Sequence, residues 1–204
     1  RFPFVDVGRK VSPAGLVPYV GADYRAATMD VVELLVGLGH RGIGLIGELS
    51  GREANLDRAE GYRLASTAAG LRPVLIEGAG IAGAQALELI RHNRLTAVVT
   101  DSSGLAEHLL DAATAAGLRV PTDLSIAQLG DPERSTGRQI DWTGFRIPRE
   151  HMGEQAVALL SRLIAGSDSS DELQTLLPCE LARGATVAPV GGFEPPTFGS
   201  SASR

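Results

Sequence analysis

Gly39-His40-Arg41-Gly42-Ile43-Gly44-Leu45-Ile46-Gly47 opens the most informative stretch of the chain, and Asp57-Arg58-Ala59-Glu60-Gly61-Tyr62-Arg63 and Ala68-Ala69-Gly70-Leu71 complete it. The stretch has the pattern of a helix end, a buried strand, a polar loop and a second helix that ends at a glycine. The polar loop follows the carboxyl end of the strand, which is where open α/β sheets bind their ligands. We therefore expect a ligand site at this loop, with the Arg58 side chain facing it from the start of the second helix.

Strands and helices alternate regularly through the following part of the chain, as far as residue 127. Strands are predicted at 43–46, 73–77, 97–100 and 124–127, and helices at 57–69, 82–92 and 105–116. The apolar runs of these strands do not alternate with polar residues, which is typical of strands covered on both faces. This order indicates a parallel sheet with right-handed crossovers.

The two ends of the chain have fewer predicted elements. A strand at 3–7 and a helix at 24–38 come first, and Asp23 is the expected N-cap of that helix. A helix at 149–165 and short strands at 173–177 and 180–187 come last, after a polar segment at 130–147 without a clear period. The tail 191–204 is rich in proline, glycine and serine, and we expect it not to fold.

The composition excludes several classes of protein. With 204 residues, 44% of them hydrophobic, the chain can build a real core, and it has no apolar run near the length of about 20 residues that a membrane helix needs. The net charge of −5 comes without a basic cluster, so no nucleic-acid surface is predicted. The single cysteine, Cys179, cannot form an internal disulfide, which favours a cytoplasmic location.

Motifs typical of enzymes occur in the sequence without the structural context that their chemistry requires. Two matches to G-x-G-x-x-G begin at Gly37 and Gly42, but neither follows a strand and opens a helix, as a dinucleotide site requires. The four histidines have no metal-ligand spacing. Ser102 and Ser103 follow a strand without a G-x-S-x-G elbow, so a helix N-cap is the simpler interpretation. We therefore predict no catalytic residue, no metal site and no cofactor.

Several motifs, in order along the chain, carry a resemblance to a known family. They are Val20-Gly21-Ala22-Asp23-Tyr24-Arg25-Ala26-Ala27, Leu38-Gly39-His40-Arg41-Gly42-Ile43, Arg58-Ala59-Glu60-Gly61-Tyr62-Arg63, Ala69-Gly70-Leu71, Ala116-Gly117-Leu118-Arg119-Val120-Pro121-Thr122-Asp123-Leu124-Ser125-Ile126 and Leu177-Pro178-Cys179-Glu180-Leu181-Ala182-Arg183-Gly184. With these motifs the chain resembles the effector-binding domain of LacI/GalR-type bacterial transcription regulators. The resemblance covers about residues 2 to 188.

The resemblance implies a two-lobed, periplasmic-binding-protein-like α/β fold with parallel sheets and a ligand cleft between the lobes. By this topology, residues 1–39 are the remnant of an incomplete N-terminal lobe, 40–146 form the C-terminal lobe, 147–168 form a helix of the N-terminal lobe, and 169–190 form closing strands of the C-terminal lobe. It also implies a homodimer without membrane contact. Operator DNA would be bound only through an N-terminal helix-turn-helix headpiece, which the 204 residues do not include.

The resemblance further implies the positions of the ligand site. Asp23 and Arg58 match residues that contact effector in such regulators, and a guanidinium offers a fixed fork of donors for hydroxyl groups. The positions of a usual Asn-Asp pair hold Ser102 and Ser103, and a usual pair of aspartates is Gly130-Asp131. The expected ligand-binding residues are therefore Asp23, Arg58, Ser102, Ser103 and Asp131.

Two departures from the family pattern bear on the ligand. A stacking aromatic residue is replaced by Gly78-Ala79-Gly80, and Ile147 stands where a polar residue is common. The sequence thus predicts the effector-binding and dimerisation domain of a LacI-type regulator that senses a small polar ligand, such as a sugar or a different effector. A solute-binding protein of a transport system and a nonfunctional gene remnant are the alternatives.

Overall fold

The computed structural model describes residues 2–12, 15–49, 51–78, 80–130, 139–166 and 173–191. The strands in this part of the chain are β1 (Asp6–Val7), β2 (Tyr19–Ala22), β3 (Ile43–Gly47), β4 (Val74–Glu77), β5 (Ala97–Thr100), β6 (Ser125–Gln128), β7 (Thr143–Arg146), β8 (Gln174–Leu177) and β9 (Glu180–Ala182). The helices are α1 (Tyr24–Gly37), α2 (Glu53–Ala68), α3 (Gly83–His92), α4 (Ser103–Ala115) and α5 (Arg149–Ala165).

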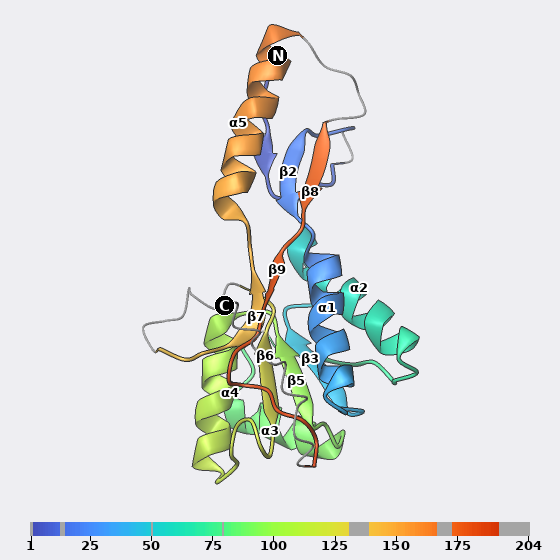
Figure 1. Cartoon of the computed structure of the whole chain (residues 1–204), viewed down its shortest axis with the longest axis vertical. Helices are drawn as coiled ribbons and strands as arrows, with labels where there is room; N and C mark the ends of the chain where they lie inside the picture. Colours follow the sequence, from blue (N-terminus) through green and yellow to red (C-terminus); the bar gives the residue numbers. More distant parts are fainter. Residues whose placement is uncertain are drawn as a thin grey trace, which may run out of the picture.

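The larger sheet has the strand order β4-β3-β5-β6-β7-β9 (Figure 1). Its strands pair in parallel from β4 to β7, and only β9 runs antiparallel to its neighbour β7. Helices α1 and α2 pack together over one face of the sheet, and α3 and α4 pack together over the other. We call this sheet and these helices the larger unit. The predicted parallel α/β sheet is confirmed.

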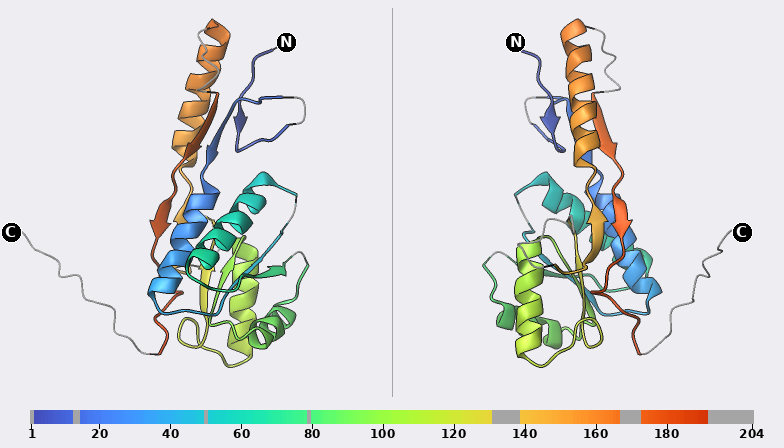
Figure 2. Two further views of the ribbon diagram at one scale, coloured as in Figure 1. Left: turned by 90° about the vertical axis from the view of Figure 1, so that its right-hand side faces the viewer. Right: turned by 60° about the vertical axis from the view of Figure 1, so that its left-hand side comes forward.

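The smaller sheet consists of β1, β2 and β8, all parallel, with α5 packed against it (Figure 2). We call this sheet and α5 the smaller unit. Met152, Ala156 and Leu159 of α5 belong to the same apolar core as Val31 and Leu35 of α1, so the core runs from one unit into the other. Three segments cross between the units: β2 to α1, β7 to α5, and β8 to β9.

These contacts correct two of the expected lobe boundaries. Residues 1–39 were assigned to the N-terminal lobe, but α1 packs against α2 and therefore lies on the larger unit. Residues 169–190 were assigned to the C-terminal lobe, but β8 pairs with β2 in the smaller sheet. Both differences arise because the chain changes units directly at the end of a strand, where no loop or change of composition signals it. Residues 192–204 of the predicted tail lie outside the described residues.

Local chemistry explains where the elements begin and end. The Asp23 carboxylate accepts a hydrogen bond from Ala26 N–H at 2.9 Å and caps α1, as predicted. Helix α2 begins at Glu53 rather than at residue 57. Its first turn carries polar side chains and the exposed Leu56, so hydrophobic periodicity does not reveal it.

No helix within the described ranges combines the length and the apolar character that crossing a membrane demands.

Candidate ligand-binding site

Arg58 lies in the second turn of α2, close to the carboxyl ends of β3 and β5, and only 8% of its surface is exposed. Its guanidinium carbon is 4.3 Å from the centroid of the Tyr24 ring, a cation–π contact. Nη1 donates to the Asn55 side-chain oxygen at 3.2 Å, whereas the buried Nε has no hydrogen-bond partner among the described residues. Burial lowers the pKa of Arg58 from its ordinary value. The arginine is therefore held in place by the protein, and its buried Nε donor is left unpaired there.

The packing of α1 on α2 sets this arrangement. A Cβ atom on Gly61 would lie 2.3 Å from the backbone oxygen of Arg25, so only glycine allows the two helices to approach so closely. The approach brings Tyr24, the first residue of α1, onto Arg58 one turn before Gly61. The Tyr24 ring also contacts Phe145 of β7, with the ring centroids 6.1 Å apart. Tyr24 of α1 thus contacts both Arg58 of α2 and Phe145 of β7.

Asp101 supplies an acceptor near Arg58, directly after the carboxyl end of β5. Its carboxylate accepts a hydrogen bond from Glu48 N–H at 2.6 Å and lies against Gly47, where a Cβ atom would be 2.6 Å from Asp101 Cγ. Burial raises the pKa of the Asp101 carboxyl, while the Glu48 N–H and the nearby Arg58 charge act in the opposite direction. Within the described part of the chain no ion pair joins Arg58 to a carboxylate. Arg58 and Asp101 therefore interact through their charges, but no hydrogen bond or ion pair among the described residues joins them.

Asp101 was missed by sequence reasoning, although a signal for it exists. It is the first polar side chain after the buried strand β5, and such positions line the ligand side of a parallel sheet. The neighbouring Ser102 and Ser103 were predicted instead. Ser102 caps α4 by accepting from Leu105 N–H at 3.4 Å, and the Ser103 hydroxyl accepts from Gln128 Nε2 at 2.8 Å.

Asp23 lies where two of the crossing segments meet. Its N–H donates to the Leu177 carbonyl at 2.8 Å, which ties the first crossing segment to the third. Cys179 lies half-buried in the third segment, and burial raises the pKa of its thiol to about 11. The charge of Asp23 also raises this pKa, whereas the charge of Arg58 lowers it. The thiol stays protonated at neutral pH and presents an uncharged surface.

Asp131, the remaining predicted residue, lies outside the described residues.

The second crossing segment brings buried Ile147 into the apolar core that also holds Phe145. The site therefore combines a cation, a carboxylate and apolar surface where the two units meet. Such a site can bind a small polar molecule, because a few placed polar groups fix the orientation of a ligand that apolar walls enclose. No group of three His, Cys, Asp or Glu side chains in the described ranges is arranged to hold a metal ion.

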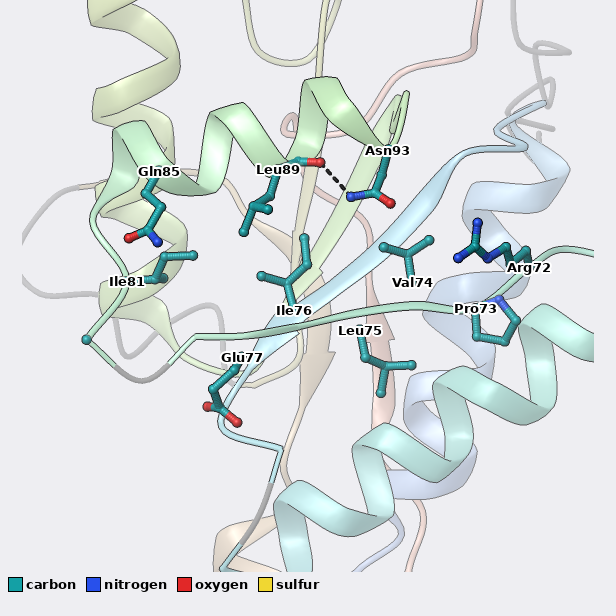
Figure 3. Close-up of a pocket in the computed structure, with 11 residues that line it drawn as sticks. Arg72, Pro73, Val74, Leu75, Ile76, Glu77, Ile81, Gln85, Leu89 and Asn93 are labelled. Atoms are coloured by element: carbon teal, nitrogen blue, oxygen red, sulfur yellow. Dashed lines mark hydrogen bonds between the residues drawn. The ribbon is translucent and has the colours of Figure 1, made fainter.

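A hollow of about 540 Å³ lies elsewhere, along the outer edge of β4 (Figure 3). Its lining includes Val74, Ile76 and Leu89, and Asn93 donates to the Leu89 carbonyl at 2.9 Å beside it. Neither Arg58 nor Asp101 lines it. The hollow is thus a feature of the sheet edge and is separate from the polar groups described above.

Comparison with known proteins identifies relatives of the chain. The family model described as periplasmic binding protein-like domain matches residues 32–187. An HTH-type transcriptional regulator of Mycobacterium tuberculosis is 29% identical over 216 residues, covering 93% of this chain and 58% of the relative. Catabolite control protein A of Priestia megaterium is 28% identical over 168 residues, covering 78% and 50%. The chain thus spans about half the length of the curated relatives it matches.

A solved structure shows the same arrangement of elements. The regulatory protein of the LacI family from Chloroflexus aggregans superimposes with a TM-score of 0.78 at 28% identity, covering 92% of this chain and 69% of that chain.

Proposed function

Because this chain belongs to the family of periplasmic binding protein-like domains, in the form found in LacI-type regulators, we propose that it is the effector-binding and dimerisation domain of such a transcription regulator. Its ligand is a small polyhydroxy compound such as a sugar, and it performs no catalysis. Operator DNA is contacted by a helix-turn-helix segment of the kind that gives its M. tuberculosis relative its name. The protein acts as a homodimer in the cytoplasm.

The relation between Arg58 and Asp101 carries this proposal. An unpaired donor on a buried cation costs free energy, on the order of 1–3 kcal/mol, until an acceptor reaches it. A hydroxyl group both accepts and donates, so neighbouring hydroxyls of one ligand can accept from Arg58 and donate to Asp101. A purely anionic ligand would satisfy Arg58 but would meet the Asp101 charge, and a purely cationic one would be repelled by Arg58.

The test is a thermal-shift screen of the 204-residue chain with ribose, glucose, galactose and gluconate. We expect at least one neutral sugar to raise the melting temperature, and Arg58→Ala and Asp101→Asn to abolish that rise. Arg58→Lys keeps the charge but loses the planar fork of donors, so it should bind more weakly. Arg91→Ala is the matched control, since Arg91 is exposed on α3 and, within the described ranges, its side chain pairs only with Glu88.

Two outcomes would contradict the proposal. One is an undiminished shift in Arg58→Ala with a native circular dichroism spectrum. The other is a response to gluconate alone, which would assign the site to organic anions.

A further inference from the structure

The loop that follows β1 joins the smaller unit to the helix that carries Arg58. Arg9 Nε donates to the Asp57 carboxylate at 2.7 Å, and Val11 N–H donates to Glu53 Oε1 at 3.2 Å. Both acceptors belong to the first two turns of α2, and Asp57 immediately precedes Arg58. The Arg9 and Asp57 side chains are only 25% and 18% exposed, so solvent screens their attraction less than at an open surface. We call residues 8–12 the Arg9 loop.

The backbone fixes the Arg9 loop to the smaller sheet. Gly8 has a φ of +125°, which lets the chain turn from β1 toward α2. Gly8 N–H donates to the Val20 carbonyl at 2.8 Å. A Cβ atom on Gly21 would lie 2.9 Å from Arg9 N, so the loop lies directly on β2 at this glycine. One end of the contact is therefore anchored in the smaller sheet and the other in α2.

We infer that Arg9 is a positioning residue for the ligand site: its ion pair with Asp57 holds the smaller unit against α2 and so keeps the site closed around Arg58. The three crossing segments connect the units through short stretches of backbone at element ends, where hinges between domains lie. The Arg9–Asp57 pair adds a contact on the helix that binds the ligand. A ligand between the units and this ion pair favour the same closed arrangement, so each strengthens the other.

The inference rests on the proposed function for its ligand, but the contact itself can be tested without one. Arg9→Asp places two carboxylates together and should open the contact, whereas Arg9→Asp combined with Asp57→Arg restores opposite charges. Arg91→Asp is the matched control, because it breaks the exposed Arg91–Glu88 pair on α3, on the other face of the larger sheet.

Hydrogen exchange and solution scattering of the 204-residue chain read out the contact. In Arg9→Asp we expect amide exchange at 8–12 and 53–58 to rise about tenfold, with the amides of α3 and α4 unchanged. The radius of gyration should also increase. The double variant should return both measurements toward wild type, and Arg91→Asp should leave them unaltered.

Sugar affinity separates a positioning role from a purely structural one. For whichever of ribose, glucose or galactose gives the largest thermal shift, Arg9→Asp should weaken binding about five- to tenfold, and the double variant should recover it. Unchanged exchange in Arg9→Asp, or failure of the double variant to restore it, would overturn the inference while leaving the ligand proposal intact. Absence of any sugar response in wild type would overturn the ligand proposal, and the exchange data would still decide whether the contact exists.

Discussion

The two units of this molecule differ in how completely their sheets are covered. Helices cover both faces of the larger sheet, and Ile46, Val98 and Leu109 in its core are fully buried. The smaller sheet carries α5, yet Phe2, Val7 and Ile164 around it are largely exposed. A hollow of about 580 Å³ between the first residues and the end of α5 is lined by Phe2, Phe4 and Leu163.

Stability and the proposed ligand-contacting side chains are divided unequally between the two units. Burial of apolar surface is the dominant source of stability, and most of it belongs to the larger unit. That unit also holds Arg58 and Asp101. The smaller unit adds little burial of its own but supplies the Arg9 loop and the second wall of the site. It is therefore expected to open or unfold before the larger unit does.

Matched isoleucines in the two units provide the largest contrast. Ile46→Ala leaves a cavity at a residue with 0% exposure and should lower the free energy of unfolding by about 2–5 kcal/mol. Ile164→Ala, at a residue 69% exposed on α5, should change it by less than about 0.5 kcal/mol. Urea unfolding followed by circular dichroism measures both. Equal effects of the two substitutions would show that the smaller unit is as well packed as the larger.

Two helical glycines give the next contrast. Gly61→Ala drives a methyl group into the Arg25 backbone oxygen and should destabilise the chain by about 1–3 kcal/mol while separating Tyr24 from Arg58. Gly153→Ala on α5 meets no atom within 4 Å and should stabilise by about 0.5–1 kcal/mol, because alanine favours helix. Thermal unfolding of both variants measures these two changes in stability. Destabilisation by Gly153→Ala would mean that α5 packs against something that its described surroundings lack.

The parallel strands β3 to β6 of the larger sheet could be predicted from sequence, whereas β7 of the same sheet and β2 of the smaller sheet could not. Alternation of apolar runs and amphipathic stretches predicts every strand from β3 to β6. Strands β2 and β7 were missed because each contains a glycine and neither shows a hydrophobic period. Strand β2 leads into the first crossing segment, so missing it also displaced the expected boundary between the units there.

The site was predictable to the extent that it follows strand ends. Arg58 follows from the loop after β3, and the same rule applied to β5 would have found Asp101. The contact of Tyr24 with Arg58 could not be predicted, because it depends on the close approach of two helices at Gly61. The Arg9–Asp57 pair spans 48 residues and depends on how the units face each other, which no local pattern encodes.

The smallest expected effect on the stability of the larger unit concerns His40, whose side chain hydrogen-bonds to Ala188, close to the last described residue. Its Nε2 lies 2.9 Å from the Ala188 carbonyl and must donate to it, and its Nδ1 lies 2.9 Å from the Thr96 hydroxyl, from which neutral imidazole accepts. Burial lowers the pKa of His40, the Ala188 hydrogen bond opposing part of the shift. In the unfolded chain this histidine protonates near pH ~6.5.

The sign of the pH effect follows from this difference. As pH falls below about 6.5, the unfolded chain binds a proton at His40 that the folded chain resists, so stability decreases until the lowered pKa of the folded state is reached. His40→Gln can keep a donor and an acceptor without titrating, and its stability should fall less between about pH 7 and pH 5. Urea unfolding of both proteins across that range isolates the contribution of His40, since every other titrating group is common to them. Parallel pH profiles would show that protonation of His40 is tolerated, with Nδ1–H donating to Thr96 and the Thr96 hydroxyl turning to the Gly42 carbonyl 3.3 Å away.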